Sequence, residues 1–91
     1  MVDAFEIDSK AKLVEIKLIK DILDTTKTLV FIDHDSKTIF LWRGKKATIF
    51  EKLIGTRVAA KLSHKYPKYR IRPIAEGEEP AAFKSLIKSI G

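Results

Sequence analysis

Midway along the chain, the pattern of apolar residues changes from short continuous runs to a spacing of nearly four residues. Thr28–Asp33 is almost entirely apolar, with β-branched and aromatic side chains, and Thr38–Trp42 has the same character after a polar turn. A different set then recurs at helical spacing: Phe50, Ile54, Val58 and Leu62. Short apolar runs of this kind are typical of buried strands, and a spacing of nearly four residues is typical of a helix. A chain that contains both must pack a helix against a sheet.

The predicted strands form an N-terminal pair and a central pair. Ala4–Ile7 and Lys12–Leu18 alternate around a short polar segment, which predicts two strands joined by a turn. Thr28–Asp33 is apolar at successive positions and is therefore expected at the centre of a sheet that is covered on both faces. The polar residues 34–37 join it to Thr38–Trp42, so we expect an antiparallel hairpin there.

Three further segments complete the predicted order. Ile19–Leu23 predicts a short helical turn. Tyr69–Ala75 alternates as a strand, and Pro73 places that strand at a sheet edge or a bulge because proline has no amide hydrogen to donate. Pro80 suits the first position of a final helix. The apolar face of that helix comprises Phe83, Leu86, Ile87 and Ile90. The chain is thus predicted to be an α/β (α+β) protein with about five strands and helices on both faces of the sheet.

The long helix carries signals at both ends. Thr48 and Glu51 have the spacing of a capping box, in which each side chain accepts a hydrogen bond from the backbone amide of the other residue. Pro67 ends the helix. Gly55 is small enough to let the helix approach the sheet closely. We expect one group of residues to be buried together: Phe31, Ile39, Val58, Leu62, Phe83 and Leu86. Trp42, which ends an apolar alternation, is also expected to pack in the core rather than to contact a ligand.

Composition limits the chain to a small number of classes. Its 91 residues supply enough apolar surface for one core and not for two, so residues 1–91 are expected to form a single domain. The absence of cysteine excludes disulfides and thiolate chemistry, and an unbridged domain of this size suits a reducing compartment. Neither a targeting segment nor a membrane-length apolar run is present in the sequence, so we expect a cytoplasmic protein.

The formal net charge of +6 is concentrated in one part of the chain. Between residues 43 and 72, ten Lys or Arg residues accompany a single acid, Glu51. Such a surface favours an acidic partner, although a solvated lysine-rich face explains the charge equally well. A polyanion would be bound by Arg43, Lys45, Lys46, Arg70 and Arg72. Nucleic acid is disfavoured as a partner because Tyr66 and Tyr69 are the only aromatic residues that would be available for base stacking.

Three segments carry a family resemblance: LVFID at 29–33, IFLWRGKKATIFEK at 39–52 and EGEEPAAF at 76–83. In this order and spacing, the chain resembles a single gelsolin/villin-type repeat, and Phe5–Ile7 resembles the first strand of that family. The resemblance implies a five- to six-stranded mixed sheet between a long helix and a short helix. It also implies an actin-binding or actin-regulating module of the cytoskeleton.

In this family the long helix of a repeat lies in a cleft between actin subdomains. The resemblance therefore implies a partner-binding face formed by Ile54, Arg57, Ala60, Lys61 and His64. A single repeat cannot span two actin subunits, so binding of actin monomers or modulation of filaments is expected rather than severing. The cationic character of the face predicts binding dominated by charge complementarity.

The family resemblance also implies a calcium site, because many of these repeats hold a calcium ion. Glu51 matches the helix glutamate of that site, and Ala75 matches the residue whose carbonyl coordinates the ion. The position of the family's aspartate is occupied by Thr28, which removes one carboxylate. We therefore expect calcium binding to be weak or absent and Glu51 to serve mainly as the capping-box acid.

Two other functions remain open from the sequence. The basic residues could bind a phosphoinositide or another anionic lipid, and the domain could dock a protein other than actin. An enzyme is not expected. The chain has no cysteine nucleophile and no glycine-rich phosphate loop, and His34 and His64 lack the spacing of a metal site or of a paired acid and base.

Overall fold

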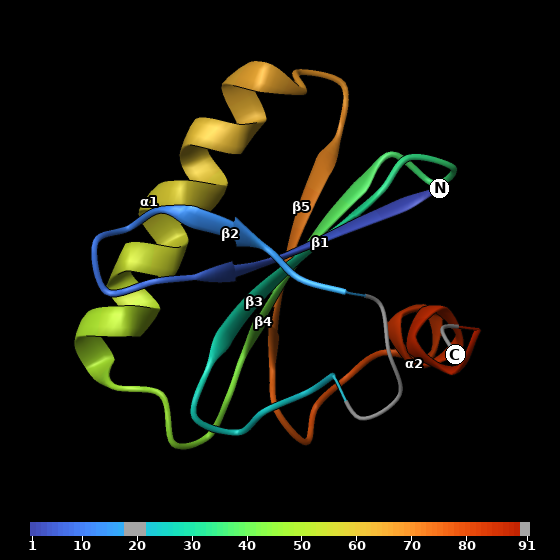
Figure 1. The fold of residues 1–91 in the computed structure, drawn as a ribbon. Coiled ribbons are helices and arrows are strands. Elements are labelled where there is room, and N and C mark those ends of the chain that lie inside the picture. Colours follow the sequence, from blue (N-terminus) through green and yellow to red (C-terminus); the bar gives the residue numbers. More distant parts are fainter. Residues whose placement is uncertain (18–21, 90–91) are drawn as a thin grey trace.

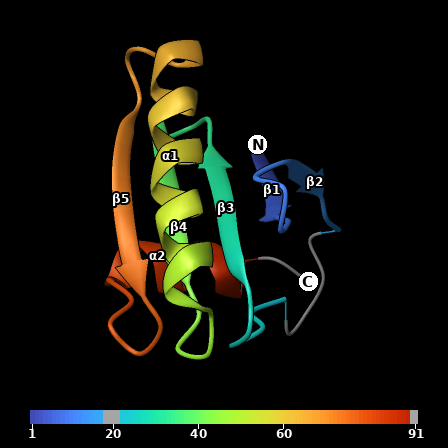
Figure 2. The same ribbon diagram turned by 90° about the vertical axis from the view of Figure 1, so that its left-hand side faces the viewer.

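The computed structural model describes residues 1–17 and 22–89 as five strands and two helices. The strands are β1 (Val2–Ile7), β2 (Leu13–Glu15), β3 (Thr28–Asp33), β4 (Thr38–Arg43) and β5 (Arg70–Ala75), and the helices are α1 (Ile49–Lys65) and α2 (Ala81–Lys88). The strands form one sheet, with α1 on one face and α2 on the other: the helices lie on either side of the sheet in Figure 1, and Figure 2 shows α1 in front of it and α2 behind it. The predicted fold, a mixed sheet between a long helix and a short helix, is confirmed.

The order of strands across the sheet is β2-β1-β3-β4-β5. β1 pairs antiparallel with β2 and β3, and β3 pairs antiparallel with β4, whereas β4 and β5 are parallel. Parallel neighbours need a long connection, which α1 supplies. The central position predicted for β3 is correct, and Pro73 lies on the edge strand β5, where a missing amide hydrogen is tolerated.

The sheet separates two apolar clusters. On the α1 side, the buried residues are Ile7, Val30, Ile32, Ile39, Leu41, Ile54, Val58, Ala59 and Leu62. On the α2 side, they are Ala4, Leu29, Phe31, Phe40, Trp42, Ile74 and Phe83. The prediction that Phe31 and Phe83 share one cluster with Ile39, Val58 and Leu62 was therefore wrong. Successive side chains of a strand point to opposite faces of the sheet, so Phe31 and Ile39 pack on different faces. α1 covers the face of Ile39 and α2 covers the face of Phe31.

Some element boundaries differ from the sequence prediction. β2 is shorter than Lys12–Leu18 because it pairs only with the second half of β1. Pro80 is the N-cap of α2 rather than its first residue, and its extended backbone leaves its carbonyl to accept the Lys84 amide at 3.0 Å. The turn predicted at Ile19–Leu23 falls largely on residues 18–21, which, like Ile90, lie outside the described residues; Ile22 and Leu23 are not helical.

The segment between β5 and α2 is held to the sheet by two glutamates. Trp42 Nε1 donates to the Glu79 carboxylate at 3.0 Å, and this bond is the main reason why the pKa of Glu79 lies below its usual value. Glu76 accepts the Lys45 amide at 2.8 Å and the Thr25 hydroxyl at 2.6 Å, and these bonds, the Lys45 amide first, lower the pKa of its carboxyl. The expected core position of Trp42 is confirmed, because the ring is buried.

Phe83 anchors α2 to the sheet and provides a test of the second cluster. Its ring packs edge-on against Phe31 and Phe40, with centroid separations of 5.5 and 5.4 Å. We expect Phe83→Ala to lower the free energy of unfolding by about 3–5 kcal/mol, because it leaves a cavity between α2 and the sheet. Urea unfolding followed by Trp42 fluorescence measures this change. Leu86→Ala is the control, since Leu86 is only partly buried; equal losses for the two variants would contradict this account.

Candidate partner-binding face of the long helix

α1 covers the sheet with one side and presents the other side to solvent (Figure 2). Three large apolar side chains lie on its first turns and are exposed: Ile49 at 78%, Phe50 at 65% and Leu53 at 60%. We call these three residues the apolar patch. Ile49 and Leu53 are four residues apart and therefore lie on the same side of the helix, with Phe50 beside them. The patch is an unusual feature for a helix that already buries another apolar stripe.

The exposure of Phe50 corrects the sequence prediction, which placed it in the core stripe. An α-helix turns about 100° per residue, so a spacing of four residues drifts by about 40° at each step. Over the twelve residues from Phe50 to Leu62, the accumulated drift is about 120°. Leu62 therefore faces the sheet while Phe50 has rotated toward solvent. Ile49 and Leu53 were not predicted to form part of a surface patch, although their four-residue spacing is visible in the sequence.

The partner-binding residues predicted from the family resemblance are not all on the surface. Arg57, Ala60, Lys61 and His64 are exposed on the second half of α1. Ile54 is only 8% exposed and packs in the cluster under α1, so its assignment to the partner-binding face was wrong. The outward face of α1 thus has an apolar first half and a cationic second half.

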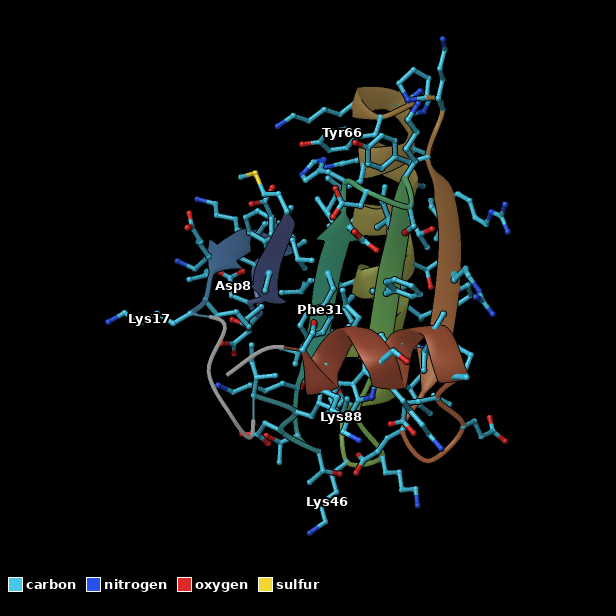
Figure 3. The ribbon with its side chains drawn as sticks, turned by 90° about the vertical axis from the view of Figure 1, so that its right-hand side faces the viewer. Asp8, Lys17, Phe31, Lys46, Tyr66 and Lys88 are labelled. Atoms are coloured by element: carbon cyan, nitrogen blue, oxygen red, sulfur yellow. The ribbon has the colours of Figure 1, made fainter. Side chains whose placement is uncertain are left out.

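The predicted polyanion residues are not gathered into one site. In the parallel pair of β4 and β5, Arg43 lies opposite Ala75 and Arg70 lies opposite Thr38. Arg43 and Arg70 are therefore at opposite ends of these strands, about 16 Å apart along them. Arg72 shares a side of β5 with Ile74, which packs toward α2, and not with Ile71, which packs toward α1. Figure 3 shows Lys46 at the end of the molecule opposite to Tyr66.

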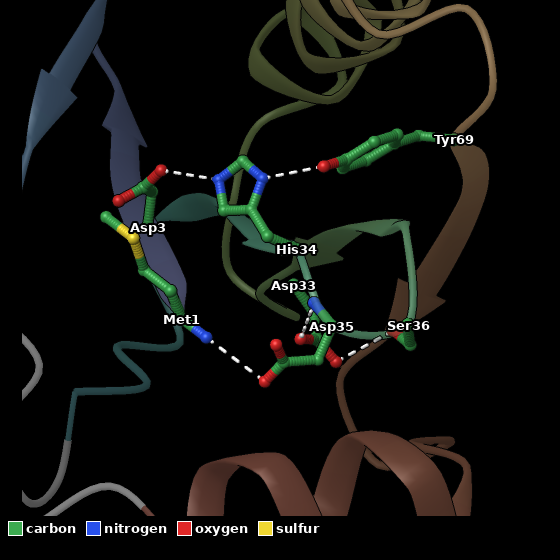
Figure 4. Close-up of polar contacts among 7 residues, drawn as sticks. All are labelled: Met1, Asp3, Asp33, His34, Asp35, Ser36 and Tyr69. Atoms are coloured by element: carbon green, nitrogen blue, oxygen red, sulfur yellow. Dashed lines mark hydrogen bonds and ion pairs between the residues drawn. The ribbon is translucent and has the colours of Figure 1, made fainter.

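The tyrosines expected to be available for base stacking, Tyr66 and Tyr69, both contact His34, and Figure 4 shows Tyr69 and Asp3 on either side of its ring. One ring nitrogen of His34 lies 2.7 Å from the Asp3 carboxylate, and the other lies 2.7 Å from the Tyr69 hydroxyl. Tyr66 and Tyr69 contact each other with ring centroids 4.9 Å apart. The cluster of these four residues joins the start of β1, the β3–β4 turn and the residue before β5, and it occupies both nitrogens of His34. Sequence spacing gave no sign of it because its members are far apart in the chain.

The residues at the family's calcium positions do not fit a calcium site. Thr28 lies opposite Arg43 in the sheet, and Arg43 lies opposite Ala75, so a cation stands between the two positions. The Ala75 carbonyl already accepts the Glu78 amide at 2.9 Å. Within residues 1–17 and 22–89, no group of three His, Cys, Asp or Glu side chains is arranged to hold a metal ion. Glu51 would be the single carboxylate among the three positions, whereas calcium requires several oxygen ligands.

Comparison with known proteins identifies the family. Residues 22–84 match the gelsolin repeat. The chain belongs to the gelsolin repeat family. It is 71% identical to a chain in the crystal structure of the Thorarchaeota ProGel/rabbit actin complex. The alignment covers 96% of the present chain and 99% of that chain, and the two structures superpose with a TM-score of 0.91.

A second gelsolin-type structure is more distant. The chain is 26% identical to one in the crystal structure of the Thorarchaeota 2DGel3/rabbit actin complex, with a TM-score of 0.78. The alignment covers 99% of the present chain but only 45% of that chain. It therefore spans about half the length of that relative. No curated protein sequence matches the chain. No helix in the described part of this gelsolin repeat is long and apolar enough to cross a membrane.

Among the described residues only one of the two capping-box bonds is present, so the expectation that Glu51 serves mainly as the capping-box acid is wrong. The Thr48 hydroxyl accepts the Glu51 amide at 3.0 Å, and no return bond from the Thr48 amide to the Glu51 carboxylate is found among the described residues. We expect Thr48→Ala to lower the free energy of unfolding by about 1 kcal/mol. Glu51→Ala keeps the amide that bonds Thr48 and should cost less than half as much. Thermal unfolding measures both changes, and a larger loss for Glu51→Ala would contradict the assignment of the cap to Thr48.

Proposed function

We propose that this gelsolin repeat binds actin through the outward face of α1. The observation that carries the proposal is the apolar patch of Ile49, Phe50 and Leu53, which is exposed on a helix whose other large apolar side chains, those of Ile54, Val58 and Leu62, are buried. Exposed apolar residues that lie together mark interaction surfaces more often than scattered ones do. The two solved relatives were crystallised as complexes with rabbit actin, and one of them is similar to this chain over nearly its whole length.

Burial of the apolar patch would supply most of the binding free energy. Fully covering a side chain of this size is worth about 1.5–3 kcal/mol, and interfaces commonly depend on a few large apolar residues near their centre. The patch changes the emphasis of the sequence prediction, in which charge complementarity dominated. Arg57, Lys61 and His64 continue the same face and would instead steer the approach to an acidic surface and fix the orientation of the helix.

A single helix face engages one actin surface. We therefore infer monomer binding or filament modulation, without severing, by a cytoplasmic binding module that catalyses no reaction. The contacts of His34 are the reason for expecting no catalysis by this residue. Both of its ring nitrogens lie close to polar partners, Asp3 and Tyr69, so neither is free to act as an acid or a base. Binding of anionic lipid stays a secondary hypothesis, and the separation of Arg43 from Arg70 weakens it.

The apolar patch is tested by placing a charge in it. Leu53→Glu and Phe50→Glu should each weaken binding to rabbit actin at least tenfold, because a buried unpaired carboxylate would replace an apolar contact. Sedimentation and actin polymerisation assays measure the change. Val14→Glu is the matched control, since Val14 is also exposed, at 47%, but lies on β2. If both patch variants bind like the wild type, α1 is not the actin-binding element.

Charge reversal separates the cationic half of α1 from the basic loop before it. Arg57→Glu with Lys61→Glu should reduce actin binding and its salt dependence, because exposed charges are screened over about 10 Å at 0.1 M ionic strength. Lys45→Glu with Lys46→Glu, at the other end of the molecule from Tyr66, should leave actin binding largely unchanged and reduce any binding to phosphoinositide vesicles. The opposite pattern would favour the lipid hypothesis.

We also infer that actin binding does not require calcium, because a single carboxylate and a neighbouring arginine are a poor environment for a divalent ion. Micromolar calcium should leave the melting temperature and the actin affinity unchanged relative to a chelator. Magnesium at the same concentration controls for general effects of divalent ions. A rise in melting temperature with calcium that disappears in Glu51→Gln would refute this inference.

A further inference from the structure

A groove of about 310 Å³ runs between α1 and β5, next to the outward face of α1. Most of its walls are apolar and come from Leu41, Ala59, Ala60, Ile71 and Pro73, and the Arg43 side chain also lines it. Ala60 belongs both to this groove and to the exposed face of α1. A partner that lies on α1 can therefore reach into the groove without any movement of the helix.

Arg43 is the unusual member of this lining. Its Nε is buried and has no hydrogen-bond partner within residues 1–17 and 22–89. Glu76 lines a second hollow that Arg43 also borders, but its carboxylate accepts from the Lys45 amide and the Thr25 hydroxyl instead. Among the described residues, no carboxylate forms an ion pair with Arg43. Arg43 as a whole is only half-buried, but a buried N–H group without an acceptor is energetically unfavourable, so an acceptor that reaches its guanidinium from the groove would form a strong, charge-assisted hydrogen bond.

The chemistry of the groove specifies the kind of group that would fill it. A guanidinium presents a planar set of donors that matches a carboxylate, and the apolar walls match the aliphatic part of an acidic side chain. We propose that the α1–β5 groove binds an Asp or Glu side chain of the protein that covers α1, with Arg43 as the residue that recognises its carboxylate. This inference rests on the proposed actin-binding function and adds a second, charge-specific contact beside the apolar patch.

The first experiment tests the groove without actin. In ¹⁵N-labelled protein, the Arg43 Nε–Hε signal and the backbone amides of Ala60 and Ile71 are followed during titration with sodium acetate, against sodium chloride at equal ionic strength. Saturable shifts at these positions with acetate, and none with chloride, support a carboxylate site. Absence of an acetate-specific shift at Arg43 overturns the proposal, because water then satisfies the guanidinium.

The second experiment tests the role of the groove in the complex. Arg43→Gln should weaken binding to rabbit actin at least tenfold, and Arg43→Lys, which keeps the charge but loses the planar donors, should recover only part of the affinity. Arg72→Gln is the matched control, since Arg72 lies on the α2 side of β5. Unchanged melting temperatures establish that the variants fold.

The two proposals fail in different ways. If the wild type binds actin, Leu53→Glu does not, and Arg43→Gln binds like the wild type, the groove inference is wrong while the α1 proposal stands. If the wild type does not bind actin at all, the proposed function is wrong, and the groove inference falls with it even where acetate shifts the Arg43 signal.

Discussion

The β3–β4 hairpin is the element on which the rest of the molecule depends. Thr28–Ile32 and Thr38–Trp42 are buried on both faces of the sheet, so each face of the hairpin needs a cover. α1 provides one cover with the stripe of Ile54, Val58 and Leu62, and α2 provides the other with Phe83. Because β5 runs parallel to β4, the connection between them must cross the sheet, and this is why the long helix comes between these two strands in the sequence.

The two sides of α1 have different surroundings: one is buried against the sheet and the other is exposed to solvent. Their separation follows from helix geometry. The small residue Gly55 lies against Thr28, where an added Cβ would come within 3.0 Å of the threonine methyl group, so the helix sits close to the sheet. Because the helix is close to the sheet, the stripe of Ile54, Val58 and Leu62 covers this face of the sheet. The opposite side is then free to carry apolar residues that the fold does not need. Such residues reduce solubility when no partner covers them, so their presence favours an interaction surface.

The chain differs from the calcium-binding pattern implied by its family resemblance at Thr28, which stands at the position of the family's aspartate. Thr28 and Arg43 are side by side in the sheet, so an arginine lies next to the position where the family pattern has an aspartate. The same arginine has no acceptor of its own in the described residues, although it lines a groove beside α1. The positive charge of Arg43 makes this position a poor environment for a metal ion, and the same charge underlies the proposed contact with an acidic group.

The sequence alone determined the elements and the fold class. The continuous apolar runs of β3 and β4, the Thr48 cap, the proline stops and the edge position of Pro73 all follow from local sequence, which acts between near neighbours. Tertiary structure decided which apolar residues are covered, because burial depends on how a helix is rotated against the sheet. For this reason Phe50 and Ile54, which look equivalent in the sequence, have opposite environments. It also brought Asp3, His34 and Tyr69 together and left the Arg43 Nε without an acceptor in the part of the chain that the structure describes, since such contacts join residues that no local pattern relates.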